Sequence, residues 1–142
     1  ERINGATLET AVQQGKVQVE YRMRSFLGIE SVRADNALAA AQNEGKFEPL
    51  REALFANQPE EKTGGFTTDD LLALGRTVGL TDAAYTNAGQ SMTYETWVQH
   101  VDDQASRDGN VGTPQLVKVG AGALTWPQTI DPAQFKAALG LT

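Results

Sequence analysis

A proline that opens a short β-rich run near the C-terminus constrains the fold more than any other feature of the sequence. Pro114 precedes Leu116, Val117 and Val119, and the glycine turn Gly120–Gly122 follows them. Sheets tolerate proline at the first residue of a strand but not in its middle. A short glycine turn of this kind joins two antiparallel strands. The stretch therefore predicts a tight hairpin that begins just after the proline.

The elements around this proline favour a cis peptide bond between Thr113 and Pro114. A long amphipathic helix precedes the bend at residues 112–114, and the hairpin and a short terminal helix follow it. A cis X-Pro bond is only about 0.5–1 kcal/mol less stable than the trans form, so a fold can keep one where it needs a sharp turn. An ordinary trans proline at the start of a strand is the alternative.

One other segment has the pattern of a strand. Along Lys16–Met23 apolar and polar residues alternate, and this period of two predicts a strand at about 17–22. We expect it to belong to one sheet with the two hairpin strands, at about 115–119 and 123–126.

The remaining segments have the apolar period of helices. Glu1–Gln14 is the first, and it lacks an N-cap residue. Thr67 and Asp70 form a predicted capping box, and Asp131 followed by Pro132 marks the start of the terminal helix. We expect helices at about 1–14, 31–43, 47–55, 67–78, 93–105 and 131–139, and a turn over 81–89.

Several polar and aromatic residues have a structural explanation. Ser31 is the predicted N-cap of the second helix. In the helix at 93–105 the apolar stripe includes Trp97, while His100 lies off the stripe, which indicates a surface residue with no catalytic task. Trp126 is predicted to lie in the core beneath the hairpin, the alternative being a surface aromatic that binds a ligand.

Composition excludes several classes of function. A chain of 142 residues is the size of one domain and can bury a core. Its net charge of −6 argues against nucleic acid as a partner, because such binding relies on clustered Lys and Arg. With no cysteine and one histidine, the sequence predicts no disulfide, no thiolate nucleophile, no metal site and no cofactor.

Four short segments occur in an order and spacing that are fairly specific. They are Gly15–Arg22, Leu54–Pro59, Tyr94–Val98 and Val111–Pro114. Their arrangement resembles the DsbA-like branch of the thioredoxin superfamily, and the resemblance covers nearly the whole chain. It implies an α/β thioredoxin-like fold with an inserted helical block. Residues 1–30 and 107–142 would form the two parts of the thioredoxin-like domain, and residues 31–106 the insertion.

The chain departs from this family at its start. Family members carry a strand that leads into Cys-x-x-Cys at the first turn of the first helix, where the helix N-terminus lowers the pKa of a thiolate. This sequence has neither. Without that central strand, the strands at 17–22 and 115–119 would have unpaired edges in the core. Each main-chain group left without a hydrogen bond there would destabilise the fold by about 1–3 kcal/mol. We therefore expect the 142 residues to begin partway along the first helix of a longer natural chain, so that the fold is N-terminally incomplete.

The resemblance implies two alternative functions. In the first, the protein is an extracytoplasmic thiol–disulfide oxidoreductase that acts on cysteine-containing secreted polypeptides, possesses its catalytic cysteines upstream of Glu1, and can have a membrane redox partner. Gly112, Thr113 and Pro114 would hold substrate backbone beside the reactive sulfur, close to Glu1 and Arg2. The 142 residues alone should then be inactive.

In the second, the protein is a redox-inactive thioredoxin-fold module that binds extended peptides through the same groove. The residues upstream of Glu1 discriminate between the two functions. A helical interaction domain unrelated to thioredoxin is a third interpretation, and the β-rich stretches at both ends of the chain argue against it.

Overall fold

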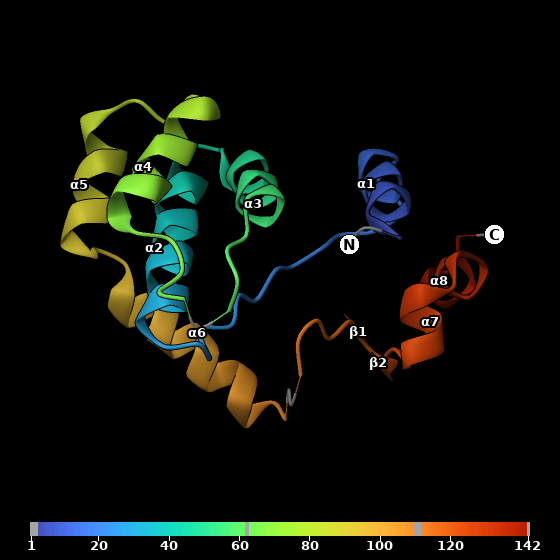
Figure 1. Cartoon of the computed structure of the whole chain (residues 1–142). Helices are drawn as coiled ribbons and strands as arrows, with labels where there is room; N and C mark the ends of the chain where they lie inside the picture. Colours follow the sequence, from blue (N-terminus) through green and yellow to red (C-terminus); the bar gives the residue numbers. More distant parts are fainter. Residues whose placement is uncertain (1–2, 62, 110–111, 142) are drawn as a thin grey trace. The chain divides into compact units, whose positions relative to one another are not determined.

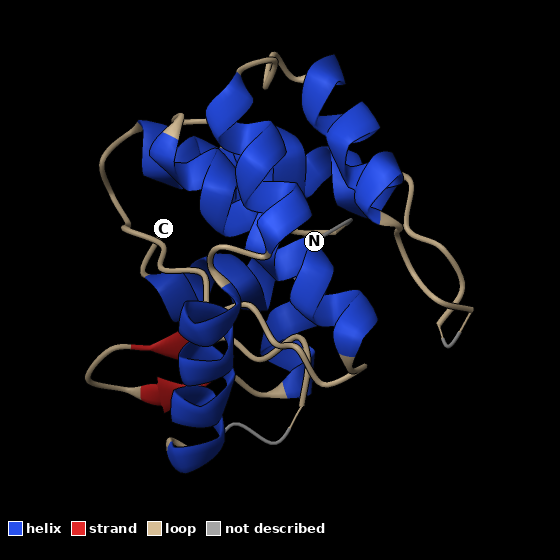
Figure 2. Ribbon diagram, turned by 90° about the vertical axis from the view of Figure 1, so that its left-hand side faces the viewer, coloured by secondary structure: helices blue, strands red, loops and turns tan. Residues whose placement is uncertain are grey.

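The computed structural model describes residues 3–61, 63–109 and 112–141, and it is mostly helical with one small sheet (Figures 1 and 2). The strands are β1 (Val117–Lys118) and β2 (Gly122–Ala123). The helices are α1 (Gly5–Gln13), α2 (Ile29–Asn43), α3 (Phe47–Ala56), α4 (Thr68–Thr77), α5 (Ala83–Ser91), α6 (Glu95–Arg107), α7 (Trp126–Ile130) and α8 (Pro132–Leu139).

The chain folds as two compact units. Unit 1 contains Glu1–Tyr21 and Asn110–Thr142, and unit 2 is Arg22–Gly109. Unit 1 is therefore built from two segments that are far apart in the sequence. Unit 2 is one continuous segment between them.

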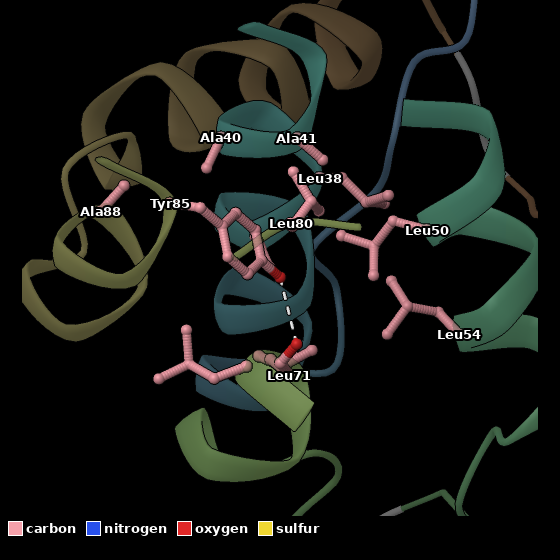
Figure 3. Close-up of a cluster of buried hydrophobic side chains, with 11 residues drawn as sticks. Leu38, Ala40, Ala41, Leu50, Leu54, Leu71, Leu80, Tyr85 and Ala88 are labelled. Carbon is pink, nitrogen blue, oxygen red and sulfur yellow. Dashed lines mark hydrogen bonds between the residues drawn. The ribbon is translucent and has the colours of Figure 1, made fainter. Parts of the chain in front are cut away.

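Unit 2 is a helical unit built around α2. This helix packs against α3, α4, α5 and α6, and α4 also packs against α3 and α5 (Figure 1). Alanines on the buried side of α2 allow the neighbouring helices to approach closely, and buried leucines each stabilise the unit by about 1.5–3 kcal/mol. The core residues are Ala37, Leu38, Ala40, Ala41, Leu50, Leu54, Leu71, Leu72, Leu80, Tyr85 and Ala88 (Figure 3).

The predicted turn over 81–89 is wrong, because this segment forms α5. Asp82 caps the helix, accepting at Oδ1 from the N–H of Tyr85 at 2.7 Å. The Tyr85 ring is buried, and its hydroxyl donates to the carbonyl of Leu71 at 3.1 Å (Figure 3). The ring also lies against Gly75, where an added Cβ would come within 2.4 Å of Tyr85 Cε1. Packing of one tyrosine thus stabilises a helix whose Thr, Asn and Gly residues have weak helix propensity.

A buried asparagine joins α2 to the connection between α5 and α6. Asn36 Nδ2 donates to the carbonyl of Ala88 at 3.1 Å, and its Oδ1 accepts from the N–H of Tyr94 at 2.8 Å. Between these partners, Met92 ends α5 in the left-handed region with φ 51°. The asparagine satisfies main-chain groups at a point where the helical hydrogen-bond pattern is interrupted.

Unit 1 contains the hairpin together with α1, α7 and α8. The predicted start of α8 is confirmed, since Asp131 Oδ1 accepts from the N–H of Gln134 at 2.8 Å. Among the described side chains of this unit, the buried apolar ones are Phe135 of α8 and Ala11 of α1. A small apolar core of this kind leaves most of the hairpin exposed.

The predicted strand at 17–22 is wrong, and the described residues form one two-stranded sheet rather than three strands. Part of the alternation is present in the burial pattern, because Val17, Val19 and Met23 are half-buried and the polar residues between them are exposed. Tyr21, which the alternation places on the same face, is exposed as well. The boundary between units 1 and 2 falls within this segment, however. Met23 packs against the core of unit 2, whereas the two valines belong to unit 1. A strand needs a neighbour for its main-chain groups, and no described segment pairs with this one.

The predicted start of α4 agrees with the structure, whereas α2 begins earlier than predicted. Thr67 and Asp70 form the predicted capping box, with reciprocal bonds of 3.2 and 2.9 Å. Ser31 is not an N-cap, because α2 already begins after Gly28. Its hydroxyl instead accepts from the N–H of Leu27 at 3.3 Å. The serine lies in the first turn of α2 and binds the main chain just before the helix.

Two tryptophans were predicted to be apolar core residues. On α6, Val98 and Ala105 are buried as predicted, but Trp97 is 56% exposed. The packing of α6 against α2 thus covers only part of the predicted stripe. His100 is exposed, as predicted. The side chain of Trp126 lies outside the described residues.

Candidate functional site

The predicted site residues Gly112, Thr113 and Pro114 form a bend between α6 and β1. All three are exposed, and the Thr113–Pro114 peptide bond is cis, as predicted. None of these side chains can ionise. The bend offers only main-chain groups and the Thr113 hydroxyl, which can donate and accept hydrogen bonds.

The hairpin that follows the bend is short and closed by glycines. Its paired residues are Val117 with Ala123 and Lys118 with Gly122. The N–H of Leu124 donates to the carbonyl of Leu116 at 2.8 Å, which extends the pairing toward the bend. Gly120 and Gly122 have φ of 81° and 93°, a region that favours glycine and permits the sharp reversal. The second predicted strand, at 123–126, is accordingly shifted to Gly122–Ala123, and α7 begins at Trp126.

The free edge of β1 is the part of this site that can bind another chain. Within the described residues, no third strand pairs with the hairpin. Val117 is exposed, and Val119 at the turn is 98% exposed. An extended peptide can add to such an edge through main-chain hydrogen bonds, with exposed apolar side chains as additional contacts. The arrangement supports binding of extended backbone and supplies no group for proton or electron transfer.

Side-chain contacts within unit 1 hold the base of the hairpin. Lys118 Nζ donates to the carbonyl of Ala138 near the end of α8, at 2.9 Å. After β2, the N–H of Thr125 donates to Gln128 Oε1 at 2.7 Å, which caps the start of α7. These contacts fix the side of the hairpin that faces α7 and α8.

The start of α1 is the second part of the predicted site. Glu1 and Arg2, beside which the bend was expected, lie outside the described residues. Asn4 precedes α1 but does not cap it; its Nδ2 donates to the carbonyl of Thr129 at 2.7 Å, and its buried Oδ1 has no hydrogen-bond partner among the described residues. A hydrogen bond between residues 125 positions apart thus joins α1 to α7.

A polar network in unit 2 was not predicted from the sequence. Arg24 Nε pairs with Asp102 Oδ1 of α6 at 2.6 Å, and the same oxygen accepts from the N–H of Ser25 at 3.1 Å. The Ser25 hydroxyl donates to Asp35 Oδ2 of α2 at 2.7 Å. Arg24 also donates to Ser106 Oγ at 3.1 Å. The network fastens the first residues of unit 2 to α2 and α6.

Burial perturbs one carboxyl group of this network. Asp35 is 6% exposed, and desolvation raises its pKa to about 6, an effect that the Ser25 hydrogen bond opposes and the nearby charge of Asp102 reinforces. Perturbed carboxyl groups are frequent in active sites, but ion-pair networks perturb them equally well. Asp35 lines no described cavity and its partners are fixed, so we assign it a structural role.

The described residues show neither a metal site nor a membrane span. No group of three His, Asp or Glu side chains in this part of the chain is arranged to hold a metal ion. Likewise, no described helix is both long and apolar enough to cross a membrane.

Comparison with known proteins identifies the family. A family model described as thioredoxin matches residues 1–139. The chain belongs to the thioredoxin family. No curated protein and no solved structure gives a significant match. None of the 142 residues is a cysteine, the residue whose thiolate carries out thiol–disulfide exchange.

Proposed function

We propose that the protein is a DsbA-like thiol–disulfide oxidoreductase of the extracytoplasmic space, acting on cysteine-containing secreted polypeptides. The match to the thioredoxin family over residues 1–139 is the observation that carries this proposal, because disulfide exchange is the chemistry of that fold. The cysteine pair would lie outside the 142 residues, which contain none.

The role of this chain in the reaction is to hold the substrate backbone. The main chain of Gly112–Pro114 and the free edge of β1 would pair with an extended segment next to the substrate cysteine. A substrate thiolate attacks one sulfur of the oxidised cysteine pair and displaces the other as a thiolate, forming a mixed disulfide. A second substrate thiolate then breaks the mixed disulfide. The substrate gains a disulfide, the pair is reduced, and a redox partner with a disulfide or quinone must reoxidise it.

The two-unit organisation supports the proposed domain plan. Unit 1 is formed by the two ends of the chain, and unit 2, residues 22–109, is continuous between them. A helical insertion between the two halves of a thioredoxin-like domain, as proposed for 31–106, would produce such a division. The proposed boundaries place the first turns of α2 and the end of α6 at the edges of the insertion.

The decisive experiment uses the natural gene. The coding region directly upstream of residue 1 is sequenced, the complete protein is produced, and oxidation of a fluorescent dithiol peptide is followed. We expect Cys-x-x-Cys upstream and turnover by the complete protein, and no turnover by the cysteine-free 142 residues. A complete protein with both cysteines that oxidises, reduces and isomerises nothing would contradict the proposal.

A redox-inactive module that binds extended peptides is the second candidate, and the cysteine-free sequence with an exposed strand edge favours it. An extended unstructured peptide is titrated into the isotope-labelled 142-residue chain, and the main-chain amides are followed by NMR. Shifts centred on residues 112–119 support peptide binding by this edge. If the upstream sequence also lacks cysteines, this second function replaces the first.

A further inference from the structure

We propose that a cavity in unit 1 binds a small organic dicarboxylate between the ammonium groups of Lys16 and Lys136. The cavity has a volume of about 390 Å³ and lies between α1, the residues after it, and the C-terminal end of α8. This volume is within the range of small-molecule sites, roughly 300–1,000 Å³. The inference does not depend on the proposed redox function.

The charges around the cavity favour an anion. Among the described residues, Lys16 and Lys136 are the charged ones that line it, and none of its described lining residues is acidic. Within the described residues, neither ammonium group has an ion-pair partner. The whole chain has a net charge of −6, so a general attraction for anions is not expected. Two cations without an ion-pair partner among the described residues therefore form a local concentration of positive charge on an acidic protein.

Stabilisation of helix ends does not account for these lysines. Cations near a helix C-terminus commonly bind its last carbonyls. Lys118 has this role, since its Nζ donates to the carbonyl of Ala138. At the end of α1, main-chain N–H groups of Gln14, Gly15 and Lys16 already occupy the last carbonyls. The side chains of Lys16 and Lys136 make no hydrogen bond to a described carbonyl, so capping of a described helix end does not explain their positions.

The uncharged lining fits the rest of such a ligand. Thr7 and Gln14 contribute a hydroxyl and an amide whose side chains make no hydrogen bond within the described residues. Ala6, Ala11 and Leu141 contribute apolar surface for a short carbon skeleton. Lys136 belongs to α8 and Lys16 to the residues after α1, so the two positive charges come from separate segments and would suit an anion with a negative charge at each end. These features favour a dicarboxylate over inorganic phosphate, which has one compact charged group.

The test is an NMR titration of the isotope-labelled 142-residue protein with succinate. Neutral succinamide, which has the same carbon skeleton, and inorganic phosphate are titrated in parallel. We expect saturable shifts of amides in α1 and at the end of α8, absent with succinamide and weaker with phosphate. Because the lysines are exposed to solvent, binding should weaken as ionic strength rises from about 0.01 to about 0.15 M.

Substitutions then locate the site. Lys16→Gln and Lys136→Gln should each weaken succinate binding about threefold and together about tenfold. Lys46→Gln, in unit 2, is the matched control and should leave binding unchanged. The amide spectra of all variants establish that they are folded. Equal shifts with succinamide, an equal effect of Lys46→Gln, or no saturable shift would overturn the proposal. Equal binding of phosphate would overturn the assignment to dicarboxylates.

Discussion

Replacing Asp35 with asparagine should stabilise unit 2 at neutral pH and have little effect in acid. In the folded protein the pKa of Asp35 is about 6, against 3.8 for a solvated aspartate, with burial as the main cause. Between these two values the unfolded chain releases the proton more readily than the folded one. The free energy of unfolding contributed by Asp35 is therefore highest below the lower pKa and falls as the pH rises through the upper one.

The size of the effect follows from the difference between the two pKa values. At 1.36 kcal/mol per pH unit, a difference of about two units corresponds to about 3 kcal/mol at neutral pH. This is an upper value, because the neutral amide of the variant would no longer receive the charge-assisted hydrogen bond from the Ser25 hydroxyl, which accounts for about 1 kcal/mol or more. We expect Asp35→Asn to raise the free energy of unfolding by about 1–2 kcal/mol at neutral pH.

The assay is urea unfolding followed by circular dichroism, for wild type and Asp35→Asn, from about pH 4 to about pH 8. The difference between the two should grow with pH and level off above the folded-state pKa of about 6. Asp103→Asn, at an exposed position of α6, is the control and should stay within about 0.5 kcal/mol of wild type throughout. If the difference in unfolding free energy between wild type and Asp35→Asn does not change with pH, the assignment of a raised pKa to the buried Asp35 carboxyl is refuted.

Substitutions at three further positions test the packing, hydrogen bonding and helix capping of unit 2 by the same unfolding assay. Gly75→Ala should destabilise it by about 1–3 kcal/mol, because the new methyl group would lie 2.4 Å from the Tyr85 ring; wild-type stability would show that α5 can move away freely. Asn36→Ala should cost about 1–3 kcal/mol, since it leaves the main-chain N–H of Tyr94 without its acceptor, while the carbonyl of Ala88 still accepts from the N–H of Thr93, and a loss below about 0.5 kcal/mol would mean that water replaces the side chain. Thr67→Ala should cost about 1 kcal/mol and Thr67→Ser almost nothing, because only the hydroxyl caps α4; equal losses would contradict the capping role.

Features with local causes could be predicted from the sequence. The capping box at Thr67 and the N-cap at Asp131 depend on residues three positions away, and the hairpin depends on the turn at Gly120–Gly122. Such signals are complete within a few residues, so the sequence alone contains them. The cis bond before Pro114 was predicted from the order of the surrounding elements.

Features that depend on distant partners could not be predicted. The period-two pattern at 17–22 is real, but a strand also requires a neighbouring strand, and residue periodicity does not contain that information. The helix α5 depends on Tyr85 finding the space beside Gly75. The environment of Asp35 depends on Ser25 and on Asp102, which is 67 positions away in the sequence. In each case tertiary contact outweighs local propensity.

The prediction of the candidate site rests on a different kind of sequence signal from the prediction of the helices. Gly112, Thr113 and Pro114 have no titratable group, so a search for acids, bases, nucleophiles or metal ligands would pass over them. A site that recognises main chain needs only an exposed edge and a bend that ends the pairing, and its sequence signature is that of a turn. Disulfide exchange at such a site would need a sulfur group that these three residues do not contain. The chain is assigned to the thioredoxin family although none of its 142 residues is a cysteine, and the choice between the two proposed functions depends on whether a cysteine pair is found outside these residues.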